Sequence, residues 1–106
     1  MSGQLAVFAR VPLGSHPDEV RTELGIYALH VRASAGTISF DLFDDLDDET
    51  TVVVWEVYRD AAAFQAHLDD PANAAFNARL AELTAGASST VARLASYEVA
   101  PVPTGA

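Results

Sequence analysis

A predicted strand that leads directly into a helix, near the middle of the chain, constrains the fold most. Residues 50–58 (TTVVVWEVY) are rich in β-branched and aromatic side chains, which is typical of a β-strand. Asp60 follows as a helix N-cap, and the alanine-rich stretch to about Leu68 is predicted to be a short helix. Four side chains with chemical or packing potential meet at this junction: Trp55, Glu56, Tyr58 and His67.

The predicted elements on either side of this junction follow the order βαββαβ. We expect strands over 4–11, 37–43, 50–58 and 90–99, a hairpin loop over 44–49, and helices over 17–32 and from 60 to Gly86, the second broken at Asp70-Pro71. Alternation in the second strand places Ile38, Phe40 and Leu42 on one face. This order predicts an α+β, ferredoxin-like fold with a four-stranded antiparallel sheet and helices on one face.

The chain has 106 residues, enough for one small domain. We expect that domain to occupy residues 1–100, and Pro101, Pro103 and Gly105 indicate a flexible C-terminal tail over 101–106. The strand over 50–58 is apolar on both faces, through Val52 and Val54 on one and Val53, Trp55 and Val57 on the other. Such a sheet needs a second cover, and a homodimer that packs sheet face against sheet face is the simplest one.

Composition excludes several classes of partner and site. With 15 acidic and 6 basic residues, the formal net charge of −9 disfavours nucleic acid and anionic membranes. The chain has no cysteine, which excludes disulfides and thiolate metal sites and fits a cytoplasmic location. The N-terminus has no signal-peptide pattern and no membrane-spanning stretch follows it. Neither a phosphate-binding nor a dinucleotide-binding glycine motif is present, and the three histidines are far apart, so we expect no cofactor and no metal.

Several segments resemble the antibiotic biosynthesis monooxygenase (ABM) family. Residues 32–40 (RASAGTISF) resemble the family's turn and following strand, and residues 56–60 (EVYRD) with His67 match its Glu-x-aromatic pattern and helical histidine. Phe76 and Leu80 are similar to an aromatic residue and a leucine on the family's next helix. The resemblance covers about residues 4–99. It implies a dimeric α/β-barrel fold with a pocket in each subunit between sheet and helices.

The activity that the resemblance implies is less specific than the fold. Some relatives are cofactor-independent monooxygenases of aromatic polyketides, whereas others degrade haem or isomerise small phosphorylated molecules, and fold alone does not choose among them. This chain has Ser34 and Ala72 where relatives often have Glu and a second His. Its His67, Asn77 and Ala9 replace the Trp, His and Asn of the haem-degrading relatives, which disfavours haem degradation.

The candidate catalytic residues are His67, Tyr58 and Glu56. A histidine titrates near neutral pH and can accept the proton of a phenol, which Tyr58 would help to polarise. Glu56 and Tyr58 share one face of their strand, with Trp55 on the opposite face. The structural alternative is that His67 braces the strand-helix junction through a bond to Glu56.

The candidate substrate-binding residues are aromatic. They are Tyr27, Phe40, Trp55, Phe64 and Phe76. Such residues hold a flat ring and exclude water, but they also make an ordinary aromatic core. The resemblance, together with these aromatic residues, implies a cofactor-independent monooxygenase of a phenolic, polyketide-type or quinol-type molecule. A non-catalytic dimer that binds a small ligand or has a structural role remains open, as does an isomerase or decarboxylase, although the six basic residues make an anionic substrate less attractive.

Overall fold

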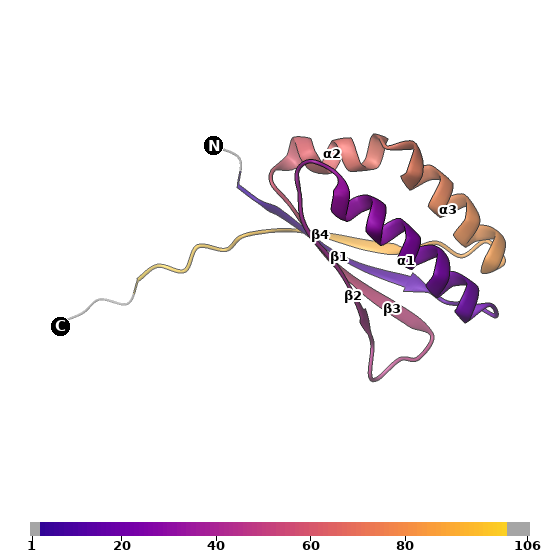
Figure 1. Cartoon of the computed structure of the whole chain (residues 1–106). Coiled ribbons are helices and arrows are strands. Elements are labelled where there is room, and N and C mark those ends of the chain that lie inside the picture. Colours follow the sequence, from indigo (N-terminus) through magenta and orange to yellow (C-terminus); the bar gives the residue numbers. More distant parts are fainter. Residues whose placement is uncertain (1–2, 102–106) are drawn as a thin grey trace.

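Four strands form one antiparallel sheet, and three helices cover one of its faces in the computed structural model, which describes residues 3–101 (Figure 1). The elements are β1 (Leu5–Pro12), α1 (Pro17–Ala33), β2 (Thr37–Asp44), β3 (Thr51–Tyr58), α2 (Ala61–Asp69), α3 (Pro71–Leu83) and β4 (Thr90–Ala95). The strand order in the sheet is β2-β3-β1-β4. The predicted ferredoxin-like α+β fold is confirmed, including the break in the second helix.

Aspartates begin the two short helices, as their positions predicted. The Asp60 carboxylate accepts a hydrogen bond from the backbone N–H of Ala63 at 2.8 Å, and Asp70 accepts one from Ala72 at 2.9 Å. Each bond pairs one of the backbone donors that a helix N-terminus leaves free. These caps fix where α2 and α3 start, and hence where their side chains meet the sheet.

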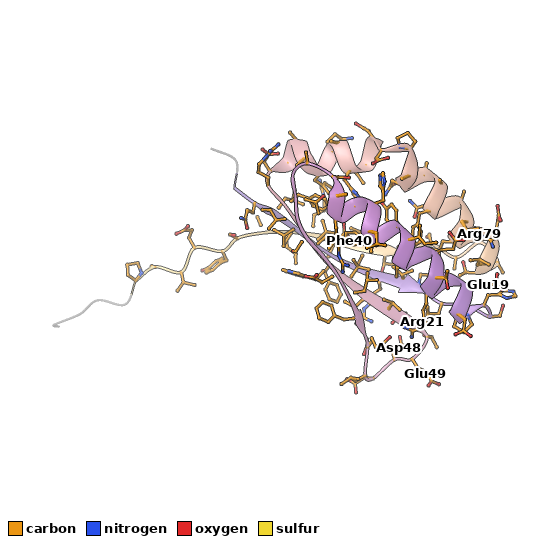
Figure 2. The ribbon with its side chains drawn as sticks, in the orientation of Figure 1. Glu19, Arg21, Phe40, Asp48, Glu49 and Arg79 are labelled. Atoms are coloured by element: carbon orange, nitrogen blue, oxygen red, sulfur yellow. The ribbon has the colours of Figure 1, made fainter. Side chains whose placement is uncertain are left out.

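The core lies between the helices and the inner face of the sheet, where side chains fill the layer and Phe40 is among them (Figure 2). Its fully buried members include Val7 and Val54 from the sheet, Val20 and Leu24 from α1, and Leu80 from α3. Burying such side chains is the main favourable contribution to folding. These side chains attach the helical layer to the sheet.

Charged residues align the helices at the end remote from the chain termini. Arg79 on α3 lies 3.7 Å from Glu19 and 3.6 Å from Glu23, both on α1, and Figure 2 shows Arg79 and Glu19 at that end. Arg21 reaches Asp44, the last residue of β2, at 2.7 Å. These exposed pairs contribute little energy each but are consistent with one packing of α1 against α3.

A β-bulge changes the expected alternation at the start of β2. Thr37 pairs with Tyr58, whereas Ser39 pairs with Val57, so Ile38 is an extra residue in its strand. Ile38 is 53% exposed, and the prediction that it shares a face with Phe40 was wrong. The physical reason is that one inserted residue reverses the side-chain alternation on one side of it.

The last strand is shorter than predicted. It ends at Ala95 rather than at residue 99, because Ala95 pairs with Leu5 and β1 begins there. Beyond Ala95 the chain runs away from the sheet (Figure 1). Apart from Pro101, the tail expected over 101–106 lies outside the described residues.

The other face of the sheet, called here the outer sheet face, has no helix over it in the described part of the chain (Figure 1). Its apolar side chains alternate with the buried ones along the strands: Phe8, Phe43, Val53, Trp55, Val57 and Leu94. Trp55 is 37% and Phe43 53% exposed. Among the helices described, none has the length and apolar character needed to cross a bilayer.

Candidate active site

A cavity of about 290 Å³ lies between the inner face of the sheet and the helices. Most of its lining is apolar: Val7, Ala9, Val11, Leu24, Phe40, Val54, Phe64, Leu68, Phe76 and Val91. Seven polar residues gather in the lining, from β3, α1, α2, α3 and the segment between α3 and β4: Glu56, Tyr27, His67, Asn73, Asn77, Ser88 and Ser89. Apolar pockets with a few converging polar groups are the usual form of small-molecule sites.

Glu56 is a buried carboxyl whose partner is Tyr58. The Tyr58 hydroxyl donates to Glu56 Oε1 at 2.5 Å, and the two residues are 0% and 6% exposed. Burial raises the pKa of Glu56 to about 7, and the bond from Tyr58 offsets only part of that rise. Glu56 therefore exchanges a proton near neutral pH, which an ordinary glutamate does not.

Tyr58 itself cannot ionise in this place. Burial, and then the nearby Glu56 charge, raise the pKa of the Tyr58 hydroxyl far above its usual value. Its proton is directed at Glu56. Tyr58 therefore acts on the cavity through Glu56, as a permanent hydrogen-bond donor.

His67 on α2 faces the same carboxyl. Its Nε2 lies 3.8 Å from Glu56 Oε1 and 3.4 Å from the Tyr27 hydroxyl oxygen. Burial is the main cause that lowers the pKa of His67, and Asp70 opposes it. The imidazole is consequently neutral at pH 7, the state in which one ring nitrogen can accept a proton.

Tyr27 on α1 connects His67 to α3. Asn73 Nδ2 donates to the Tyr27 hydroxyl oxygen at 2.9 Å. The Tyr27 ring stacks on Phe76 with centroids 4.7 Å apart and meets the Phe40 ring edge-on at 5.8 Å. Burial raises the pKa of Tyr27 to about 12, so its hydroxyl also keeps its proton at neutral pH.

The structure brings most of the predicted site residues together around this cavity. Glu56, His67, Tyr27, Phe40, Phe64 and Phe76 all line it. Tyr58 does not border the cavity but lies next to Glu56. Trp55 needs a correction: it lies on the outer sheet face, because neighbouring residues of a strand point to opposite faces. The cavity lining therefore excludes Trp55.

Sequence reasoning missed the amides of α3. Asn73 and Asn77 line the cavity, and Asn77 Nδ2 donates to Asn73 Oδ1 at 3.2 Å. Their positions carried a signal, since residues 73, 76, 77 and 80 recur at the spacing of one helix face and Phe76 and Leu80 are buried. Asn73 is half-buried and Asn77 exposed, and both place an amide beside buried Phe76 at the wall of the cavity.

The charge of the lining limits what the cavity can bind. Of the residues described, no Lys or Arg lines it, and Glu56 is its acidic group. Within residues 3–101 there is also no group of three or more His, Cys, Asp or Glu side chains arranged to hold a metal ion. The arrangement suits an uncharged, flat ligand with a polar group at one edge.

Solved structures share this architecture over nearly the whole chain. Rv0793 from Mycobacterium tuberculosis is 29% identical, with a TM-score of 0.77 over 93% of this chain and 100% of that one. PA3566 from Pseudomonas aeruginosa is 27% identical, with a TM-score of 0.78 over 94% and 98%. A variant of SnoaB from Streptomyces nogalater, described as a cofactor-independent oxygenase, is 18% identical, with a TM-score of 0.79 over 95% and 100%.

A comparison with curated proteins found no match. The family model described as "Antibiotic biosynthesis monooxygenase" matches residues 5–79, which include β1 to α2 and most of α3. That range contains the catalytic candidates and both amides of α3. The match covers well over half of the sequence, and the chain belongs to the antibiotic biosynthesis monooxygenase (ABM) family.

Proposed function

We propose that this protein is a cofactor-independent monooxygenase that acts on an uncharged phenolic molecule of the polyketide or quinol type. The observation that carries the proposal is the group formed by His67, Tyr27 and Glu56 in a cavity whose lining is mostly apolar. A neutral imidazole, an un-ionised phenol and a carboxyl that titrates near pH 7 can together move protons in a largely apolar site.

The first step is removal of the substrate's phenolic proton. His67 Nε2 is the base, because its ring is neutral and faces the cavity beside Tyr27. The phenolate transfers one electron to dioxygen, and the resulting radical and superoxide combine at the ring carbon para to the oxygen. An apolar lining favours this step because it keeps water away from the anion and its radical.

The second step turns the peroxide into a quinone. The peroxide anion takes up a proton from the Glu56 carboxyl, which lies 3.8 Å from His67 Nε2 and has a pKa of about 7. The Glu56 carboxylate then removes the C–H proton from the same carbon, which breaks the O–O bond and leaves a carbonyl on the ring. The departing hydroxide takes up the proton that His67 received from the phenol and is released as water, so both groups return to their starting states. Overall, one phenol and one dioxygen give one para-quinone and one water, so electrons balance without a reductant.

The family assignment and the description of SnoaB as a cofactor-independent oxygenase support the reaction class. An isomerase or decarboxylase acting on an anion is less well supported, because the described lining of the cavity contains no basic residue other than His67. An uncharged phenolic substrate needs no basic side chain to bind it. The proposal therefore rests on local chemistry as well as on relatedness.

Dioxygen consumption tests the proposal. Purified protein is given a series of hydroquinones, naphthols and anthrones, and oxygen uptake and quinone absorbance are recorded. We expect turnover with at least one of them, and a decrease of about 10²-fold or more in His67→Ala, in line with loss of a general base. His16→Ala is the matched control, because His16 is an exposed residue outside the cavity. Folded protein without oxygen uptake on every substrate contradicts the proposal.

A ligand-binding protein without catalysis is the second candidate. Within residues 3–101 every buried side-chain nitrogen or oxygen already has a hydrogen-bond partner, which favours a site that holds a ligand by shape. In that case a flat phenol binds and changes its own absorbance or fluorescence spectrum, and no oxygen is consumed. His67→Ala then weakens binding only modestly.

We also propose a homodimer that packs through the outer sheet face. Phe8, Val53, Trp55 and Val57 leave apolar surface there, which a second copy related by two-fold symmetry can bury. Sedimentation should give twice the chain mass, and Trp55→Asp should give a folded monomer. A monomeric parent protein at micromolar concentration would disprove this arrangement.

A further inference from the structure

A line of three hydrogen-bonding side chains leads from α3 to His67. Asn77 Nδ2 donates to Asn73 Oδ1 at 3.2 Å, Asn73 Nδ2 donates to the Tyr27 oxygen at 2.9 Å, and that oxygen lies 3.4 Å from His67 Nε2. We propose that Asn73 is a positioning residue: acting through Tyr27, it keeps the proton of neutral His67 on Nδ1 and leaves Nε2 free as the base. This inference rests on the proposed function for its catalytic meaning.

The direction of the first bond follows from the chemistry of the two amides. An amide group has a donor end and an acceptor end, so the bond from Asn77 occupies the acceptor oxygen of Asn73. Its NH₂ group is then the end that faces Tyr27. The bond from Asn77 thus favours the orientation in which Asn73 presents its NH₂ group to the tyrosine.

The direction of the second bond decides what Tyr27 does. A phenol has a single hydrogen, and the Tyr27 oxygen is already accepting from Asn73. Its hydrogen is therefore available to His67 Nε2, which must be unprotonated to accept it. The tyrosine ring is held in place for this by stacking on Phe76, with 6° between the ring planes.

The distance of 3.4 Å between Tyr27 and His67 is long for a hydrogen bond. Catalytic hydrogen bonds are often long before substrate binds. A phenol oxygen can enter here and contact both atoms, giving its proton to His67 Nε2 and receiving the Tyr27 hydrogen. Tyr27 then stabilises the new phenolate, and it remains a donor because its own pKa is raised to about 12.

The opposite direction would disable the site. If Asn73 turned its oxygen to Tyr27, the tyrosine would donate to Asn73 and accept from His67. Nε2 would then carry the proton, and neither His67 nor Tyr27 would offer a base at that place. The two directions leave Tyr27 and His67 in the same positions and differ in which end of the Asn73 amide faces Tyr27 and in where the protons lie.

Nitrogen NMR of protein labelled in its histidine rings distinguishes the two hydrogen-bond directions without any substrate, because it reports which ring nitrogen of His67 carries the proton. At pH 7, where the ring is neutral and Glu56 is not fully ionised, we expect the Nδ1–H form for His67, with exposed His16 as the internal reference. Asn73→Asp should convert His67 to the Nε2–H form, since the introduced carboxylate only accepts hydrogen bonds and takes the Tyr27 hydrogen. Asn73→Ala offers Tyr27 no acceptor and should keep the parent form.

A second variant guards against an indirect effect of charge next to Tyr27. Asn77→Asp leaves Asn73 in place but presents an acceptor to it, which turns the Asn73 oxygen toward Tyr27. We expect the same change of His67 to the Nε2–H form. An Nε2–H form in the parent protein, or an unchanged ring in both aspartate variants with well-dispersed spectra, overturns the inference.

Turnover supplies the link to catalysis. On a substrate that the parent protein oxidises, Asn73→Asp should lower kcat by about 10²-fold with little change in KM, because the base is lost and not the pocket. Asn73→Ala should lower kcat by less than about 10-fold. Equal losses of kcat in the two variants contradict the positioning role. If the NMR results hold but no phenol is oxidised, the hydrogen-bond direction stands and the proposed function falls.

Discussion

The two faces of β3 are similar in sequence but differ in what covers them. The inner face carries Val52 and Val54, which are 3% and 1% exposed, and then Glu56 and Tyr58. The outer face carries Val53, Trp55 and Val57, of which Trp55 is 37% exposed. The apolar side chains alone do not tell which face the helices cover. The inner face buries a polar pair as well, and the hydrogen bond from Tyr58 to Glu56 satisfies it there.

The largest difference between the faces should appear on introducing a charge. Val54→Asp puts a carboxylate into the core, and we expect a loss of more than about 4 kcal/mol, enough to unfold the chain. Val53→Asp, one residue away on the outer face, should leave a folded monomer. Circular dichroism and sedimentation measure the two outcomes. Equal unfolding by both variants would show that the faces are not distinct.

The buried carboxyl should make stability depend on pH with an unusual sign. The pKa of Glu56 is about 7 in the folded chain, against an ordinary 4.5. As pH rises, the unfolded chain loses this proton first, so the stabilisation is complete below about pH 4.5 and is lost as pH passes 7. Its size is of order 3 kcal/mol.

Glu56→Gln removes this dependence. The unfolding free energy of the variant minus that of the parent should increase by about 3 kcal/mol between pH 4.5 and pH 8 in urea titrations. His67, whose pKa is lowered, gives the opposite slope below its usual pKa, but it is present in both proteins. A difference that stays constant with pH would mean that Glu56 is ionised throughout.

A smaller loss of stability should follow from removing Tyr58, the hydrogen-bond partner of the Glu56 carboxyl. Tyr58→Phe deletes the only hydrogen bond assigned to Glu56 among the described residues and should cost about 1–3 kcal/mol at pH 8. The cost should decrease at pH 5, where the protonated carboxyl is easier to bury. Tyr97→Phe is the control, because Tyr97 is 87% exposed and should show no change in urea unfolding.

The smallest effect concerns the helix that closes the inner face over His67. Asp60→Ala removes the bond to the backbone of Ala63 and should cost about 1 kcal/mol, seen as a lower midpoint of thermal unfolding. Asp60→Asn keeps an N-cap and should restore most of the loss. An equal loss in both variants would point to the charge of Asp60 rather than its cap.

Much of the fold could be predicted because local signals agreed with each other. The aspartate caps, the proline after Asp70 and the strand over 50–58 each specify one element, and the order of elements then leaves few ways to build a sheet. The bulge at Ile38 could not be predicted, since it depends on register with β3, which is a long-range property. The same holds for the end of β4, which is set by where β1 begins.

The candidate site was predicted in its composition but not in its connections. His67, Glu56 and the aromatic residues could be chosen by type and position, whereas Trp55 was assigned to the pocket although strand alternation argued for the other face. The role of Asn73 could not be derived, because it depends on a contact with Tyr27, 46 positions earlier in the chain. Periodicity can place an asparagine on a buried face but cannot name its partner.

The break between α2 and α3 at Asp70 has a geometric consequence for the site. His67 and Asn73 are six residues apart, and on one continuous helix they would point about 120° away from each other. In this fold each lies on its own short helix, and both reach the same cavity. The interruption therefore lets two consecutive helices each direct a polar side chain into the same cavity.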